Sequence, residues 1–351
     1  MKGLTRAVSE QLNVNASYGS LLSELKKAEK NVENIEDILS FIRSLRMVAK
    51  GGTVRGFSED GLLELERSIC NAIVSKLDVQ LLGQETPYHR LCNWIRSIDR
   101  KTAIEIFTTN YDMLMEQALE DLGVPYFDGF VGARRSFFDL RAIEDNLIPV
   151  HWSRLWKIHG SINWYQEKIE EENVVYRSSE IKKDASHLIY PSHLKYEESR
   201  KMPYLALIDQ LNRFIRRKSS FLILSGYSFN DGHLNDTIMN ALKANPTAMV
   251  LGLMYGAYKD QGTERYPEAY RLAKKQHNLN IWTFDTAIIG TNLGAWVKSQ
   301  NDEDDEVDLK PFAQSETTDD GPQCLVKLGD FSEFTRFLQK IIGSPRGVSN
   351  G

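Results

Sequence analysis

Ile104-Glu-Ile-Phe-Thr-Thr-Asn-Tyr-Asp-Met-Leu-Met-Glu-Gln-Ala-Leu119 is the stretch that decides the fold of this chain. β-Branched and aromatic side chains at 104–107 predict a buried strand. The apolar residues that follow recur at helical spacing, at Leu114, Ala118 and Leu122. A polar corner separates strand from helix and consists of Thr108, Thr109, Asn110 and Asp112. The stretch therefore predicts a strand that runs directly into a helix.

A second polar element follows a short apolar run, in Leu155-Trp-Lys-Ile-His-Gly-Ser-Ile-Asn-Trp164. In a parallel α/β sheet, such corners lie at the carboxyl ends of strands, where ligands bind. The missing side chain of Gly160 would allow a ligand to approach the backbone beside His159. We expect the fold to bring the two corners together.

Strand and helix patterns alternate through the second half of the chain. Ser220–Leu224 is a near-continuous apolar run, which is typical of a central parallel strand. Further strands are predicted at 248–254 and 279–284, and helices at 203–218, 232–244 and 264–277. Alternation of this kind indicates βαβ units. The predicted fold class is α/β, with a Rossmann-like, doubly wound, mostly parallel sheet and an N-terminal helical insert.

The first hundred residues carry mainly helical apolar stripes. Asn34, Ser58 and Pro87 are expected to start three of the helices. The stripes are expected to pack against other helices rather than against a ligand. Lys50–Gly56 is glycine-rich but lacks the spacing of a dinucleotide fingerprint, and we interpret it as an inter-helix loop.

Four regions are expected in chain order. They are a helical module at 1–99, a domain with the ligand pocket at 100–300, an acidic flexible loop at 301–322, and a strand, helix and tail at 323–351. Within the second region, Glu167–Glu180 is charged and is expected to form a mobile hairpin or loop with little strand.

Composition excludes several classes of protein. The net charge of −5 and the lack of a long basic tract argue against a protein that acts mainly on duplex DNA. No apolar run approaches the length of a membrane span, and no secretory signal is visible. The three cysteines, Cys70, Cys92 and Cys324, form no Cys-x-x-Cys pair and suit a reducing cytoplasm. No P-loop is present, so the chain is not expected to be an ATPase itself.

Four motifs occur in order at 108–112 (Thr-Thr-Asn-Tyr-Asp), 128–132 (Asp-Gly-Phe-Val-Gly), 157–161 (Lys-Ile-His-Gly-Ser) and 224–231 (Leu-Ser-Gly-Tyr-Ser-Phe-Asn-Asp). Together they resemble the sirtuin-like domains of bacterial anti-phage systems, over roughly residues 100–255. The helical stretch Asn34-Ile-Glu-Asp-Ile-Leu-Ser-Phe41 resembles the insert of these proteins. The overall layout and His187-Leu-Ile-Tyr-Pro191 are most similar to the sirtuin-like subunit that is paired with a HerA-type ATPase.

The resemblance implies an NAD+ hydrolase that acts as the effector of an anti-phage complex. It implies that Asn110 holds the ribose and orients the attacking water, that Asp112 helps hold the nicotinamide, and that His159 acts on a ribose hydroxyl. Histidine suits that role because it accepts and returns a proton near neutral pH. The remaining expected cofactor-binding residues are Thr108, Thr109, Gly226, Ser228 and Asn230.

The residues alone leave structural alternatives open. Asn110 or Asp112 could simply cap the following helix, and His159 could be a packed core histidine. Asp231 could be only a helix cap, and His233 and Asn235 could line the adenine side of the pocket or be structural. The polar corner at 108–112 is expected to be buried, so its groups need partners.

The resemblance also sets expectations about cofactors and assembly. Sirtuin-like domains open with a strand and a Gly-rich loop that are missing here, so this chain is expected to lack the first residues of the family. The four zinc cysteines of deacylating sirtuins are missing too, and no metal is predicted. A homo-oligomer with the ATPase is expected in the cytoplasm, with no membrane contact, and with nucleic acid only through that complex. The competing functions are a non-catalytic sensor of NAD or another nucleotide and a DNA-processing subunit.

Overall fold

A computed structural model describes residues 2–83, 85–98, 100–169, 172–180, 187–189, 203–297, 312–318 and 321–342. These residues form eleven α-helices together with parallel and antiparallel sheets. The predicted mixed α/β class is therefore confirmed. The chain divides into two compact units. The first is Met1–Leu81, Lys101–Glu120 and Pro125–Leu207, and the second is Leu82–Arg100, Asp121–Val124 and Ile208–Gly351.

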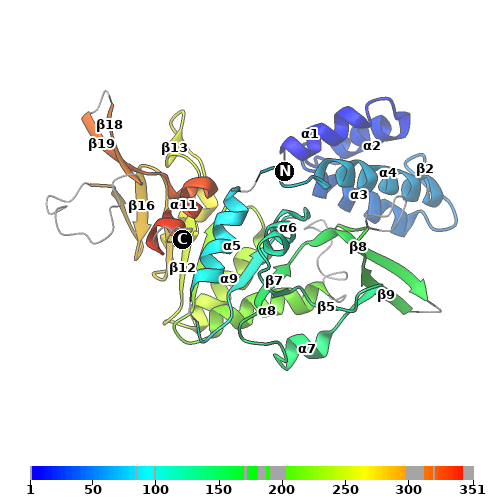
Figure 1. Ribbon diagram of the computed structural model, residues 1–351. Helices are drawn as coiled ribbons and strands as arrows, with labels where there is room; N and C mark the ends of the chain where they lie inside the picture. The colour runs from blue at the N-terminus through cyan, green and yellow to red at the C-terminus, as the bar shows by residue number, and fades with distance from the viewer. Residues whose placement is uncertain are drawn as a thin grey trace. The chain divides into compact units, whose positions relative to one another are not determined.

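Four helices begin the first unit, drawn in blue in Figure 1: α1 (Lys2–Gln11), α2 (Ala16–Lys27), α3 (Ile35–Val48) and α4 (Glu59–Leu77). The predicted caps are confirmed, because Asn34 Oδ1 accepts from the Glu36 amide at 3.1 Å and Ser58 Oγ accepts from the Gly61 amide at 3.2 Å. The stripes of the four helices form one buried core. Tyr111 and Ile162, one from each polar corner, belong to the same core. The helical segment therefore packs directly against both corners.

The two corners follow strands of a short parallel sheet of order β3-β7-β4. Its strands are β3 (Glu105–Thr108), β7 (Ser153–Lys157) and β4 (Tyr126–Phe127). Helix α6 (Leu114–Asp121) follows β3, and Gly123 after it has φ +61, a backbone conformation that glycine adopts readily. The strand-to-helix prediction for the opening stretch is therefore confirmed.

A second sheet in the first unit has the order β10-β8-β9-β6-β5. Its strands are β5 (Phe130–Val131), β6 (Ser136–Phe138), β8 (Gly160–Ile169), β9 (Glu172–Arg177) and β10 (His187–Ile189), and α7 (Leu140–Glu144) follows β6. The prediction of little strand at 167–180 was wrong, because β8 and β9 pair antiparallel from Trp164 opposite Arg177 to Ile169 opposite Glu172. The Trp and Tyr side chains at 164–165 and the Val and Tyr side chains at 174–176 support this pairing despite the charged residues nearby. The loop expected at 50–56 contains the strand β1 (Thr53–Val54), which pairs with β2 (Phe57–Ser58).

The second unit contains a five-stranded sheet of order β11-β12-β15-β16-β17. Its strands are β11 (Phe221–Ser225), β12 (Met249–Leu253), β15 (Leu279–Trp282), β16 (Thr286–Ile289) and β17 (Asn292–Ala295). The first three strands run parallel. The apolar run at 220–224 was predicted to be central, but β11 is the outer strand of this sheet among the described strands, and its Phe221 is 51% exposed.

The helices of the second unit are α5 (Pro87–Ser97), α9 (Gly232–Ala244), α10 (Pro267–Ala273) and α11 (Phe331–Ile341). Helix α8 (Tyr204–Arg216) begins in the first unit and ends in the second. Two small hairpins complete the second unit, β13 (Lys259–Asp260) with β14 (Thr263–Glu264) and β18 (Ala313–Thr318) with β19 (Gly321–Val326). Helices α11 and α5 lie side by side (Figure 1), and Arg90 joins them by donating to Ser332 Oγ at 2.9 Å and to Thr335 Oγ1 at 3.2 Å.

Three sequence predictions are not tested by the described residues. The acidic run at 301–306 lies outside the described residues. The four expected regions stay a prediction, as does a single doubly wound sheet.

Candidate functional site

The corners after β3 and β7 are joined by backbone hydrogen bonds. The two strands are parallel, with Thr108 opposite Lys157. The Ile158 amide donates to the Thr108 carbonyl at 2.9 Å, and the Ile162 amide donates to the Tyr111 carbonyl at 3.0 Å. The residues that follow each strand therefore leave the same edge of the sheet, and 108–112 lies beside 158–162.

His159 projects from the second corner and is only slightly exposed. Its side chain keeps 12% of its surface accessible. The imidazole lies 6.4 Å from the ring of Tyr111, measured between centroids. Gly160 follows with φ +94, so the turn needs a residue without a side chain. The imidazole of His159 is thus held beside the first corner on a tightly turned backbone.

Glu36 is a third contributor to this site, and the sequence interpretation missed it. Its carboxylate accepts a hydrogen bond from the Tyr111 hydroxyl at 3.0 Å and lies 3.9 Å from His159 Nδ1. Glu36 comes from the first turn of α3, far away in sequence. An acidic residue there is ordinary for a helix start, so no local signal distinguishes it.

The first corner is more open than expected. Asn110 is exposed and Asp112 is half-buried, so the prediction of a buried polar corner was wrong. The corner lies at the edge of the sheet rather than in the core, so water can form hydrogen bonds with its polar groups. The backbone amide of Asn110 donates to Thr108 Oγ1 at 3.0 Å, and this hydrogen bond closes a tight turn. Thr109 is half-buried in the same turn.

Asp112 has a structural contact at the start of α6. Its Oδ1 accepts from the amide of Leu114, the first residue of α6, at 3.1 Å, and this contact favours the capping alternative for Asp112. An ionised carboxylate accepts several hydrogen bonds through its two oxygens. Capping therefore leaves capacity for a ligand on the same side chain.

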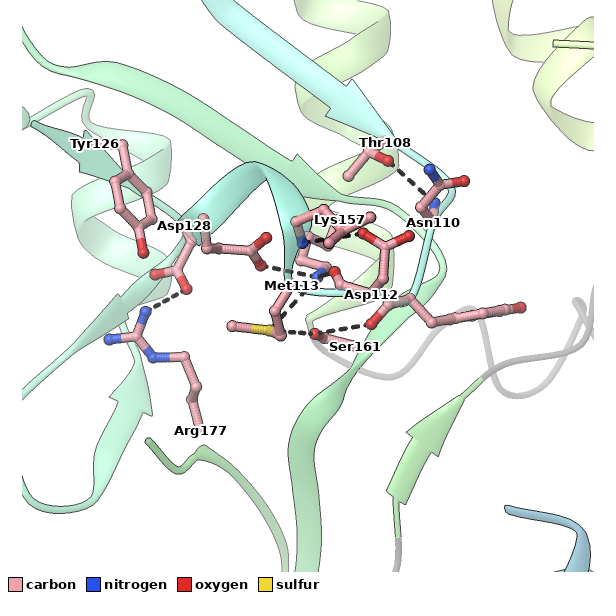
Figure 2. A network of polar contacts seen from close by, with 12 residues as sticks. Thr108, Asn110, Asp112, Met113, Tyr126, Asp128, Lys157, Ser161 and Arg177 are labelled. Carbon is pink, nitrogen blue, oxygen red and sulfur yellow. Dashed lines mark hydrogen bonds and ion pairs between the residues drawn. The ribbon is translucent and has the colours of Figure 1, made fainter. Parts of the chain in front are cut away.

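A buried ion pair between Lys157 and Glu116 lies next to the first corner (Figure 2). Lys157 is 1% exposed and Glu116, on α6, is 3% exposed. Lys157 Nζ donates to Glu116 Oε1 at 2.8 Å and also to the Asp112 carbonyl. Burial raises the pKa of the Glu116 carboxyl, and the Lys157 cation opposes that shift. The lysine of the 157–161 motif thus ties the end of β7 to the corner after β3.

A second ion pair lies at the Asp128 motif (Figure 2). Asp128 is buried, and its Oδ2 accepts from Arg177 Nη1 at 2.5 Å while its Oδ1 accepts from the Phe130 amide at 3.1 Å. Burial raises the pKa of the Asp128 carboxyl, and Arg177 opposes the rise. Gly129 has φ +96 and packs against Phe138. These contacts join the turn after β4 to strand β9.

The other predicted binding residues lie in the second unit. Gly226 and Asn230 are exposed and Ser228 is half-buried, in the loop that follows β11. Gly226 has φ +71, as expected for a tight turn at this glycine. The structure therefore places Gly226, Ser228 and Asn230 together, in a different unit from Asn110, Asp112 and His159.

Two neighbours of that loop have structural contacts. Asp231 Oδ1 accepts from the His233 and Leu234 amides at 3.0 and 3.2 Å, so Asp231 caps α9 as one alternative proposed. Asn235 is buried, donates to the Phe229 carbonyl at 2.8 Å and accepts from the Tyr227 hydroxyl at 2.7 Å. These contacts favour the structural interpretation of Asn235.

In the described ranges, no group of three or more His, Cys, Asp or Glu side chains is placed to hold a metal ion. Among the helices described, none has both the length and the apolar character needed to cross a bilayer.

Comparison with known proteins identifies the family. The model of the SIR2-like domain matches residues 104–279, which include both corners and the loop after β11. No curated protein matches the chain. The matched range covers half of the sequence, and the chain therefore belongs to the SIR2-like domain family.

Proposed function

We propose that this protein is an NAD+ hydrolase that releases nicotinamide and ADP-ribose. SIR2-like domains use NAD, and membership of the family indicates an NAD-dependent enzyme in general. The observation that carries the proposal is the joining of the Asn110 and His159 corners at the carboxyl ends of two adjacent parallel strands. Ligands of open parallel sheets bind at this edge.

The reaction breaks the bond between C1′ of the ribose and the nicotinamide nitrogen. Water supplies the new C1′ hydroxyl, nicotinamide leaves as a neutral ring, and one proton is released. Because the nicotinamide of NAD+ is positively charged, it is a good leaving group. The protein therefore needs to hold the ring, stabilise a positively charged ribose and place a water molecule.

The residues at the corner have the chemistry for these three tasks. The exposed side-chain amide of Asn110 can donate a hydrogen bond to, and accept one from, a water molecule or a ribose hydroxyl. Asp112 uses Oδ1 for the helix cap and retains acceptor capacity for the nicotinamide amide. His159 accepts a proton from a ribose hydroxyl and returns it later in the cycle.

The loop after β11 has its own groups that suit binding of ribose or phosphate oxygens. Gly226 leaves room for close approach to the backbone, and the Ser228 hydroxyl and the Asn230 amide can bind ribose or phosphate oxygens. The amino end of α9, which follows this loop, favours negative charge.

An uncontrolled NAD hydrolase would kill its host, so its activity needs control. We propose that control lies in assembly, as a homo-oligomer with a HerA-type ATPase, and that the complex is an anti-phage effector. The resemblance of the 34–41 and 187–191 segments supports this finer assignment. Light scattering at micromolar concentration, with and without the ATPase, should show a homo-oligomer and a larger complex. A monomer in both samples would contradict it.

Nicotinamide release from NAD tests the hydrolase. The protein alone and with the ATPase is compared with His159→Ala in the same two samples. We expect release by the wild-type protein and a loss of about 100- to 10,000-fold in the variant, the usual contribution of a positioned acid–base group. Equal rates in the two proteins would refute the assignment. Metal-dependent cleavage of DNA without nicotinamide release would instead favour a DNA-processing subunit.

A further inference from the structure

We propose that Glu36 is a positioning residue for His159, so that the N-terminal helical segment supplies part of the reactive centre. The inference rests on the proposed function, because it gives Glu36 a role in the proton transfer assigned to His159. It goes beyond that function, because it makes α3, whose apolar stripe was expected to pack against other helices, part of the site.

The contacts place a carboxylate near Nδ1 of the imidazole. Glu36 Oε1 lies 3.9 Å from His159 Nδ1, and the two side chains are 10% and 12% exposed. The same oxygen accepts the hydroxyl of Tyr111 at 3.0 Å. The distance to Nδ1 is that of an ion pair and is too long for a hydrogen bond. Glu36 therefore acts on His159 mainly through its charge.

Glu36 is held in place from several sides. Its backbone amide donates to Asn34 Oδ1, and the neighbouring Ile35 amide donates to Thr5 Oγ1 at 3.0 Å. Ile35 is 1% exposed and Tyr111 is 4% exposed, both within the core of the helical segment. The carboxylate is therefore not a freely solvated acid at a helix end.

The arrangement suits a histidine that accepts a proton on its other nitrogen. With a carboxylate beside Nδ1, the neutral ring favours the tautomer that carries hydrogen on Nδ1 and leaves Nε2 as the acceptor. When Nε2 takes the proton of a ribose hydroxyl, the ring becomes positive within 4 Å of a negative charge. That charge stabilises the imidazolium until Nε2 returns the proton.

A purely structural role predicts different behaviour. Acidic residues in the first turn stabilise helices generally, and Glu59 also lies in the first turn of its helix, α4. Glu36→Gln keeps the shape and the acceptor for Tyr111 but removes the charge. Glu59→Gln removes a first-turn acidic charge from another helix of the same segment and is the control.

Steady-state kinetics of nicotinamide release give the first test, with the ATPase present. Glu36→Gln should lower kcat by about 10- to 100-fold, a part of the contribution of a positioned acid–base group, with KM within about twofold. Glu59→Gln should match the wild-type protein. Glu36→Asp, which keeps the charge, should recover part of the loss. Wild-type kcat in Glu36→Gln, or an equal loss in Glu59→Gln, would overturn the proposal.

A second measurement does not need activity. Nitrogen-15 NMR of the imidazoles reports the tautomer of His159, and a His159→Gln sample assigns its signal among the seven histidines. At a pH where the ring is neutral, we expect hydrogen on Nδ1 in the wild-type protein and a mixture of tautomers in Glu36→Gln. An unchanged tautomer would overturn the role of Glu36, even where nicotinamide is released.

Failure of the proposed function gives a different pattern. In that case, wild-type protein with the ATPase releases no nicotinamide, while the tautomer measurement still reports whether Glu36 positions the ring. If Glu36→Gln does not fold, Tyr111→Phe replaces it. This variant frees Glu36 Oε1 from its donor but keeps the core ring, and a smaller loss in kcat with a shifted tautomer population is expected. No change in either readout would overturn the proposal.

Discussion

Replacing Lys157 by Met should destabilise the protein strongly, because it leaves Glu116 buried without its cation. Both partners are almost fully buried, and their 2.8 Å contact is accompanied by the bond from Nζ to the Asp112 carbonyl. Removing one member of a buried ion pair costs about 3–5 kcal/mol. For a unit of 150–250 residues, this corresponds to a fall in Tm of roughly 6–20 °C.

The double variant Lys157→Met/Glu116→Leu separates the ion pair from packing. It removes both charges, and apolar replacements for a buried pair are often neutral. We expect it to recover the larger part of the Tm lost by Lys157→Met, measured by thermal denaturation under the same conditions. A Tm for the single variant within about 2 °C of wild type would refute the interpretation of this contact as a buried ion pair.

The destabilisation should also depend on pH. Burial already raises the pKa of Glu116 in the folded protein, and losing Lys157 raises it further. The folded state then binds more protons than the unfolded state between the ordinary carboxyl pKa, about 4.3, and the raised value. The deficit of Lys157→Met should be smallest below that ordinary pKa and grow as the pH rises through the raised pKa. A deficit that shrinks with rising pH would contradict this mechanism.

Three further variants test other parts of the structure. Asn110→Ala should leave Tm unchanged within about 2 °C because the residue is exposed, yet lower nicotinamide release by about 100-fold or more, through loss of a polar group that orients the reactants. Arg177→Met should lower the unfolding free energy by about 2–3 kcal/mol in chemical denaturation, less than for a fully buried pair, because Arg177 is partly exposed; Arg177→Lys should retain part of this. Asp231→Ala should cost about 1 kcal/mol as a lost helix cap, and Asp231→Asn should cost much less.

The local elements were predictable because their signals are local. The caps at Asn34 and Ser58 and the strand-to-helix turn at 104–121 follow from short-range patterns, and the structure has all of them. The meeting of the two corners followed from the rule that parallel strands end at the same edge.

What could not be predicted depends on tertiary packing. Glu36 reaches His159 only because the helical segment shares a core with Tyr111 and Ile162. The exposure of Asn110 depends on how the corner ends at the sheet edge, which a run of polar residues does not specify. The charged residues at 167–180 led to the prediction of a loop, but β8 and β9 pair there. Cross-strand aromatic and β-branched contacts, such as Tyr165 opposite Tyr176, stabilise this pairing.

Nicotinamide release from NAD by the wild-type protein and by His159→Ala, each with the ATPase, tests the proposed hydrolase most directly. We expect release by the wild-type protein and a rate lower by about 100- to 10,000-fold in the variant, with an unchanged Tm. Release at the same rate by both proteins, or by neither, would contradict an NAD+ hydrolase built on His159.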